Sequence, residues 1–350
     1  MNNSDRDDDT SEEAGGALAA ITDLISDSTL PAPIKRNFFK AFGQLCTAAV
    51  EIPVAHLEGI ATEKRAETEA RVRLIKKGSQ EIAAQMQFDP DYARAAVKKF
   101  GQRIIRERVN LDRVTKLAAD QIAESQQETD IPASDNQKEI SDDWLNTFEK
   151  EASQKSTADM QSMFAKVLAG EIRRPETFSI KSVKLLGEMD ANTAKLFVRL
   201  CSLSLALVIK TPADEHIVDV RVASLSGNAS TNSLQKYGLG FSQLNVLHEY
   251  GLIIPDYNSW FDYRLCVADA NKRIAAPFTY QGKLWGLVPT EGSQAAQQVR
   301  ISGVALSKTG QELWRIVEPI GPNDYTADLS AYFERRKLSM VAITKESKTQ

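Results

Sequence analysis

The sequence predicts a mainly α-helical protein that ends in an α+β module. Up to about residue 203, apolar residues recur at three- and four-residue spacing, as they do on one face of a helix. After residue 207, short segments alternate between apolar and polar residues, as strands do. The 350 residues are 42% hydrophobic and 26% charged. They are therefore sufficient for two or three domains with a sizeable core.

The N-terminal part is predicted to be a disordered acidic tail over residues 1–16, followed by a long helical hairpin domain over 17–125. The tail has almost no apolar side chains to bury. A first helix over 17–26 should end before Pro31 and Pro33, and another should begin near Ile34. Two long helices, over 54–86 and from Pro90 to about 125, form the expected hairpin. The first carries a coiled-coil-like seam, formed by Val72, Ile75, Ile82 and Met86.

A compact helical bundle is predicted over residues 141–207, after a linker over 126–140 whose composition is typical of turns. Its four short helices should begin near Ser141, Thr157, Ser179 and Asp190. Asp190 is expected to cap the fourth helix, because its carboxylate can accept a hydrogen bond from the first turn.

The last part, residues 208–350, is predicted to be a winged-helix-like α/β module. Strand patterns occur at 217–222, 252–254, 263–267, 278–288 and 299–306. Helices are expected at 241–250 and after Ser307. The order of these elements resembles that of a winged helix, which serves either to read DNA or to contact proteins.

Motifs that would indicate catalysis are missing, so we predict a protein that is not an enzyme. The sequence has no P-loop, no esterase elbow and no H-E-x-x-H pair. Its three cysteines are far apart and its three histidines are scattered, so we expect no metal and no cofactor. Acidic residues between 142 and 151 are interpreted as solvated charges of a helix N-terminus. A hydrolase or nuclease is the least favoured alternative.

Charge is distributed unevenly although the whole chain carries a net charge of only −4. Residues 61–118 hold 14 basic and 8 acidic side chains, whereas residues 119–160 hold 3 basic and 11 acidic ones. The basic segment predicts a surface for an anionic partner, formed by Lys98, Lys99, Arg103, Arg106, Arg108, Arg113 and Lys116. The alternative is a solvated face that packs against acidic segments of the chain or of a second copy.

The helix at 241–250 would be the recognition helix of a winged helix, but it contains no Lys or Arg. Gln243 and Asn245 have the side chains that read adenine. Without neighbouring cations these two side chains would bind DNA only weakly, because contacts to the phosphates supply most of the affinity. This composition favours contact with a protein over the reading of DNA.

Several short motifs resemble an uncharacterised bacterial family known as domain of unknown function 2806. The main one is FAKVLAGEI at 164–172, followed by Pro175 and by TFS at 177–179. YGLI at 250–253 and LSKTG at 306–310 also fit the pattern. The chain is similar, more loosely, to the abortive-infection alpha proteins of phage defence. The resemblance implies a bacterial setting and supplies no catalytic residues. Within the main motif, small side chains at 165, 169 and 170 should allow close helix packing, with Phe178 filling the space.

Together these observations predict a non-enzymatic scaffold or sensor, with a role in antiphage defence, that acts through protein contacts. DNA binding through the winged-helix-like module and the basic hairpin is the alternative. We expect a homo-oligomer, with a dimer favoured, at most weak binding of nucleic acid, and no transmembrane segment. The unpaired cysteines and the polar N-terminus predict a cytoplasmic location.

Overall fold

The computed structural model describes residues 30–46, 90–124, 138–210, 215–290, 298–321 and 324–343, together with 25, 26 and 28. The chain divides into two compact units, residues 1–187 and 188–350, which are described separately. The predicted acidic tail, the predicted helix over 54–86 and most of the predicted linker lie outside the described residues.

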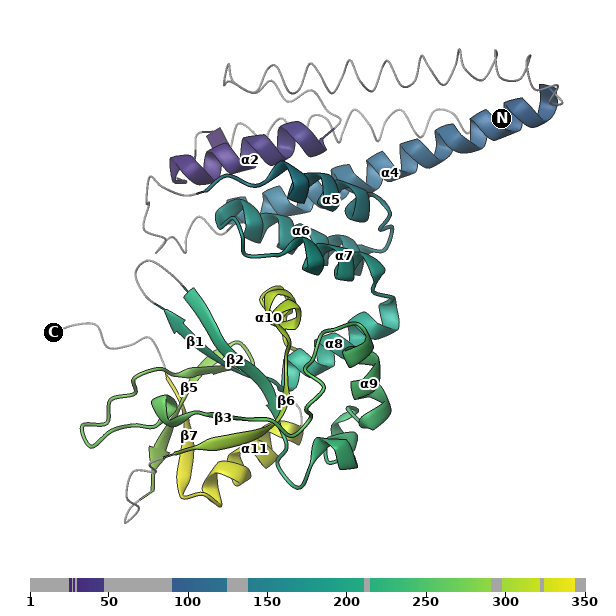
Figure 1. Ribbon diagram of the computed structural model, residues 1–350. Helices are drawn as coiled ribbons and strands as arrows, with labels where there is room; N and C mark the ends of the chain where they lie inside the picture. Colours follow the sequence, from purple (N-terminus) through teal and green to yellow (C-terminus); the bar gives the residue numbers. More distant parts are fainter. Residues whose placement is uncertain are drawn as a thin grey trace. The chain divides into compact units, whose positions relative to one another are not determined.

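The first unit is helical (Figure 1). Its elements are α2 (Ala32–Leu45), α4 (Pro90–Glu124), α5 (Asp142–Ser153), α6 (Ala158–Arg173) and α7 (Ile180–Glu188). The C-terminal half of α4 packs against α2, α5 and α6. Leu111, Val114, Ala118 and Ile122 recur at three- and four-residue spacing and are fully buried, whereas Leu117 is exposed on the other side of the helix. The second long helix of the predicted hairpin therefore exists with the expected bounds.

Aromatic side chains fill the core of this unit. Phe38 and Phe42 of α2 stack with ring centroids 3.9 Å apart, and Phe148 of α5 meets Phe164 of α6 edge to face at 5.6 Å. All four are fully buried. Burying a ring of this size contributes about 1.5–3 kcal/mol. Beyond these rings, α4 packs against α5 and α6, and α2 packs against α6, so helices that are distant in sequence share one core.

The motif at 164–178 forms the corner after α6. A Cβ atom on Gly170 would lie 2.7 Å from Cε2 of Phe178, so the glycine makes room for this ring. The buried Glu171 carboxylate accepts hydrogen bonds from the backbone amides of Glu176 (2.6 Å) and Phe178 (2.9 Å). The indole of Trp144 donates to the carbonyl oxygen of Phe178 at 2.8 Å. The predicted packing role of the small residue and of Phe178 is confirmed.

The second unit contains a seven-stranded sheet and several helices (Figure 1). Its helices are α8 (Ala191–Leu203), α9 (Phe241–Glu249), α10 (Lys308–Trp314) and α11 (Asp324–Glu334), with 3-10 turns η2 (Ala229–Thr231), η3 (Gln235–Tyr237) and η4 (Arg264–Cys266). Asp190 caps α8 as predicted, accepting from the amide of Thr193 at 2.7 Å. Figure 1 shows α8, α9 and α10 grouped on one side of the sheet.

The strands are β1 (Leu205–Lys210), β2 (Glu215–Ala223), β3 (Trp260–Asp262), β4 (Phe278–Tyr280), β5 (Lys283–Pro289), β6 (Arg300–Ala305) and β7 (Leu338–Ala342). Their order in the sheet is β3-β6-β2-β1-β4-β5-β7, and all of these neighbours pair antiparallel. The mixed α+β class is thus confirmed, but the sheet is larger than the strand patterns indicated.

Four expected elements differ in the structure. The strand pattern at 278–288 is divided into two strands, β4 and β5, which pair antiparallel. The strand expected at 263–267 is wrong, because β3 ends at Asp262 and η4 follows. The strand expected at 252–254 is reduced to a single bridge between Ile253 and Leu306. The fourth helix of the predicted bundle, α8, belongs to the second unit, where it contacts α9 and β2.

A buried ion pair lies on β2. Arg221 donates to both carboxylate oxygens of Asp219, at 2.5 and 2.7 Å, and to two backbone carbonyls. The Tyr263 hydroxyl donates to the same carboxylate at 2.8 Å. Burial, together with the Asp219 carboxylate, raises the pKa of Tyr263 well above its ordinary value, so this donor stays protonated. Both charges are therefore paired and hydrogen-bonded, as burial requires.

Candidate functional site

The structure separates the seven predicted basic residues into two groups. Six are exposed, namely Lys98, Lys99, Arg103, Arg106, Arg113 and Lys116. At 100° per residue five of the six lie within an arc of about 100° on the side of α4 away from the buried residues Leu111, Val114 and Ala118. The exception is Arg103, which lies about 20° from Val114, on the side of α4 that is buried further along the helix. Arg108 instead turns toward the core of the first unit and forms an ion pair with Glu149 at 3.1 Å. We refer to the six exposed residues as the basic face of α4.

The basic face has few acidic neighbours. Arg103 pairs with Glu107 one turn along the helix, at 2.7 Å. Lys98, Lys99, Arg113 and Lys116 form no ion pair with any described residue. From Lys98 to Lys116 the face extends over about 27 Å. It therefore presents several uncompensated positive charges along one straight rod.

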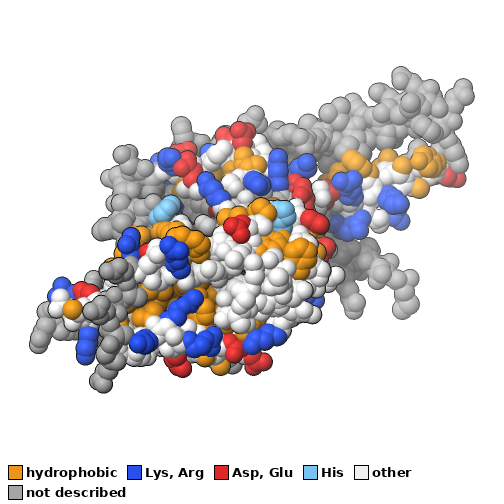
Figure 2. Space-filling view, turned by 60° about the horizontal axis from the view of Figure 1, so that its bottom comes forward, with side chains coloured by type: hydrophobic (Ala, Val, Ile, Leu, Met, Phe, Trp, Pro, Cys, Tyr) orange, Lys and Arg blue, Asp and Glu red, His pale blue; other side chains and the backbone are white. Residues whose placement is uncertain are grey.

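Apolar side chains are exposed beside these charges. Phe100 is 49% exposed, Ile105 64% and Val109 42%. Figure 2 shows hydrophobic and basic side chains next to one another on the stretch of α4 at its right. Single exposed apolar side chains are normal on protein surfaces, but Ile105 and Val109 lie one turn apart and form a small apolar patch beside the charges. Apolar patches rimmed by polar residues occur at surfaces that contact another macromolecule.

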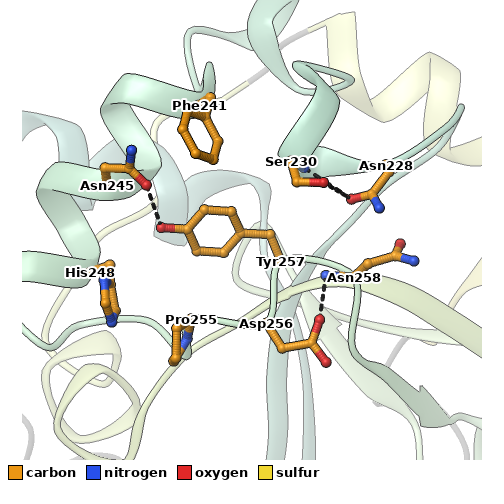
Figure 3. A pocket seen from close by; sticks show the side chains of 9 residues that line it. All are labelled: Asn228, Ser230, Phe241, Asn245, His248, Pro255, Asp256, Tyr257 and Asn258. Carbon is orange, nitrogen blue, oxygen red and sulfur yellow. Dashed lines mark hydrogen bonds between the residues drawn. The ribbon is translucent and has the colours of Figure 1, made fainter.

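A second candidate site is an open pocket of about 400 Å³ in the second unit. Phe241, Asn245 and His248 lie on one face of α9 and form one wall (Figure 3). The segments 228–230 and 255–258 form the rest, with Asn228, Ser230, Pro255, Asp256, Tyr257 and Asn258. No Lys or Arg lines the pocket.

Hydrogen bonds fix the pocket side chains in place. The Tyr257 hydroxyl donates to Oδ1 of Asn245 at 2.9 Å, and its ring meets Phe241 edge to face at 6.0 Å. Burial raises the pKa of Tyr257, and the nearby Glu249 carboxylate adds to this, so the phenol remains a donor. Oδ1 of Asn228 accepts from the amide and the hydroxyl of Ser230.

Sequence reasoning found only part of this pocket. It singled out Gln243 and Asn245 as side chains able to read a base. The structure places Asn245 in the pocket and leaves Gln243 outside it, where it accepts from the hydroxyl of Ser242 at 3.1 Å. The contributions of 228–230 and 255–258 had no motif that could have revealed them, because they are brought to α9 by the fold.

In the part of the chain that the structure describes, no group of His, Cys, Asp and Glu side chains has an arrangement that could hold a metal ion. None of the described helices is long and apolar enough to cross a bilayer.

The geometry thus defines a class of protein with a helical unit, an α+β unit and two candidate binding surfaces. Residues 94–330 match the family model described as Protein of unknown function (DUF2806). The match covers well over half of the chain, which therefore belongs to this family. No curated protein and no solved structure matches the chain.

Proposed function

We propose that this protein is a non-enzymatic interaction protein, a scaffold or sensor, that contacts its partner through the basic face of α4. The observation that carries the proposal is the separation of α4 into two sides. One side is anchored in the core through Leu111, Val114 and Ala118, and the other presents uncompensated cations beside exposed apolar residues. A rigid, anchored helix of this kind holds a binding surface in a fixed geometry.

The mixture of charges and apolar side chains favours a protein partner with an acidic, partly apolar surface. Ile105 and Val109 can bury apolar area against such a partner, whereas a phosphate backbone offers none. The positive charges would steer an acidic partner to the surface and speed association. A second copy of the chain is one candidate, because other segments of the sequence are strongly acidic.

Site-specific photo-crosslinking in cells tests this proposal. A benzoylphenylalanine at position 99 should form discrete protein adducts that resist nuclease. These adducts should disappear when Arg106 and Arg113 are changed to Glu. The same label at Lys184, an exposed residue of α7, is the control and should give no such adduct. Adducts at position 99 that nuclease removes would contradict the proposal.

DNA binding is the second candidate function. Its support is the order of the local elements. The turns η2 and η3 and the helix α9 precede Ile253, which forms a single bridge with Leu306 directly after β6, and β6 pairs with β2. A helix followed by antiparallel strands is the order that the winged-helix interpretation of the sequence expects. Against it, α9 carries no Lys or Arg, and Glu249 would repel the phosphate backbone.

A titration with duplex DNA at low and moderate salt distinguishes the two surfaces. One variant changes Lys98, Lys99 and Arg103 to Glu, and another changes Gln243 and Asn245 to Ala. We expect weak, sequence-independent binding that only the first variant loses, because phosphate contacts dominate such affinity. Loss of binding to one particular sequence in the second variant alone would make the α9 module a DNA reader.

The charge reversal needs a matched control. Changing Lys150, Lys181 and Lys184 to Glu alters the net charge by the same amount at exposed positions elsewhere in the first unit. Binding in this control should fall less than in the variant of the basic face. An equal loss in both would mean that overall charge, and not the basic face, carries the DNA affinity.

A role in antiphage defence belongs to the same proposal and rests on the sequence resemblance to abortive-infection alpha proteins. Bacteria that carry the gene should restrict plating of some phages. The basic-face variant should lose this restriction if partner contact is required for it. Unchanged plating across a broad phage panel would argue against this setting.

A further inference from the structure

The strand β7 is the last strand at one end of the sheet, where it pairs with β5 alone (Figure 1). Successive residues of such a strand direct their backbone N–H and C=O groups alternately toward the neighbouring strand and away from it. The N–H of Ile343, directly after β7, donates to the carbonyl oxygen of Leu284 at 2.8 Å, so Ile343 faces β5. By this alternation, Met340 and Ala342 direct their backbone groups away from β5.

The hydrogen bonds of β5 agree with this alternation. Met340 lies opposite Leu287 of β5, and the carbonyl oxygen of Leu287 accepts from the N–H of Ala268 at 2.8 Å. This carbonyl therefore points to the side of β5 that is remote from β7, as it does when two opposite residues both turn away from each other. No described residue forms a hydrogen bond with the backbone groups of Met340 or Ala342. These two residues thus offer two donors and two acceptors that the fold itself does not use.

This edge of the sheet is accessible to a partner. Met340 is half-buried, Val341 is 37% exposed and Ala342 is exposed. The preceding helix α11 packs on a face of the sheet, because the ring of its Phe333 lies 6.2 Å from the ring of Phe278 on β4. Access to the outward backbone groups of β7 is therefore open in the part of the chain that the structure describes.

The strand at the opposite end of the sheet is protected, whereas β7 is not. β3 has only three residues and contains Asp262, whose carboxylate pairs with Arg264 at 3.3 Å. Short edge strands and charged side chains are common means by which proteins prevent another strand from pairing. β7 is longer, and its sequence LSMVA contains neither a charged residue nor a proline. It is therefore the edge of this sheet that can accept an additional strand.

Positive charge lies where β7 begins. Arg336 and Lys337 are exposed and belong to the turn that joins α11 to β7. The guanidinium of Arg336 stacks on the ring of Tyr332, with Cζ 3.6 Å from the ring centroid, which holds this charge in place. Neither Arg336 nor Lys337 forms an ion pair with any residue that the structure describes. An acidic group bound at this end of the edge would be attracted by both cations.

We propose that β7 binds an extended segment of a protein partner by β-strand addition, and that this segment carries acidic residues at its C-terminal end. The backbone groups of Met340 and Ala342 would bond to the added strand, as at other free sheet edges that bind peptides. The added strand would run antiparallel, as all neighbouring strands of this sheet do. Its C-terminal end then lies beside Arg336 and Lys337, which attract acidic side chains. This surface is independent of the function proposed for the basic face of α4.

Fluorescence anisotropy of labelled peptides titrated with the full chain tests the proposal. The reference peptide alternates Val and Thr and ends in Glu-Glu. A second peptide carries Glu-Glu at its N-terminus and should bind about three- to tenfold more weakly, because its charges then lie far from Arg336 and Lys337. A third has the reference sequence with all Val and Thr amides methylated. It should bind at least about tenfold more weakly, since it keeps the charges but has no N–H to donate to β7.

Variants locate the binding on β7. Met340→Pro removes an outward N–H that β5 does not use, so the sheet should tolerate it. Met340→Ala is the matched control, because it also loses the side chain but keeps the N–H. The reference peptide should bind Met340→Pro at least about tenfold more weakly than Met340→Ala. With Arg336 and Lys337 both changed to Glu, the chain should prefer a peptide that ends in Lys-Lys, a reversal that misfolding would not produce.

Three results would overturn the proposal. The first is no binding of the reference peptide up to about 1 mM. The second is equal binding of the methylated peptide, which would mean that charge alone attracts it. The third is a dimer in light scattering that Met340→Pro converts to a monomer, which would assign the edge to β7 of a second copy.

Discussion

Replacing Gly170 by Ala should have opposite effects on stability in two backgrounds. In the native chain the new methyl group would lie 2.7 Å from the ring of Phe178, which is only 2% exposed and cannot move away freely. Overpacking of this kind costs about 1–3 kcal/mol. Because Ala has a higher helix propensity than Gly, the substitution also stabilises α6 by about 0.5–1 kcal/mol, which offsets part of this cost. The difference between the midpoints of these two ranges predicts a net destabilisation of about 1 kcal/mol.

In the Phe178→Ala background the ring is absent. That change alone should cost about 3–5 kcal/mol, because it empties a buried site. Gly170→Ala should then stabilise the first unit by about 0.5–1 kcal/mol, since only the helix propensity remains. The expected coupling of about 1–3 kcal/mol falls in the range measured for residues in direct contact.

Urea unfolding followed by fluorine NMR of 5-fluorotryptophan measures this coupling. Of the four tryptophans, only Trp144 lies in the first unit, so its resonance reports on that unit separately. Additive effects within about 0.5 kcal/mol would refute the idea that position 170 is a glycine because of the Phe178 ring.

The other predictions concern the core, the oligomeric state and the N-terminus. Phe164→Ala and Leu168→Ala should each destabilise the first unit by about 2–5 kcal/mol, since both side chains are fully buried; unchanged melting temperatures would contradict this. Light scattering at micromolar concentration should return about twice the chain mass of 38.7 kDa, and the mass of one chain would exclude a dimer. Removal of residues 1–16 should leave the melting temperature unchanged; strong amide-exchange protection in that segment would argue against this.

Helices were predictable from sequence where one periodic signal dominated. The pattern from Leu111 to Ile122 predicted the buried side of α4, and Asp190 predicted the start of α8. The strands of the sheet were harder to predict from the sequence. The run from Leu205 to Ile209 is continuously apolar, and such a run does not distinguish a buried strand from the end of a helix. The elements α11 and β7 followed no clear periodic pattern and were not predicted.

The binding surfaces show the same limit. The basic face of α4 was largely predictable because its residues share one helix, and helical geometry alone places all of them except Arg103 on one side. Arg108 was misassigned because its partner, Glu149, is 41 residues away in sequence. The pocket could not be predicted as a whole, since Asn228, Asn245 and Asp256 come together only through the tertiary fold.

The buried pair on β2 has a consequence for folding specificity. Asp219 and Arg221 are two residues apart, so both side chains point to the same face of the strand. If β2 paired with β1 or β6 one residue out of place, both charges would turn to the opposite face and lose Tyr263 and their carbonyl partners. A buried charge that loses its partners costs several kcal/mol. The pair therefore selects one register for the central strands, beyond any stability it contributes.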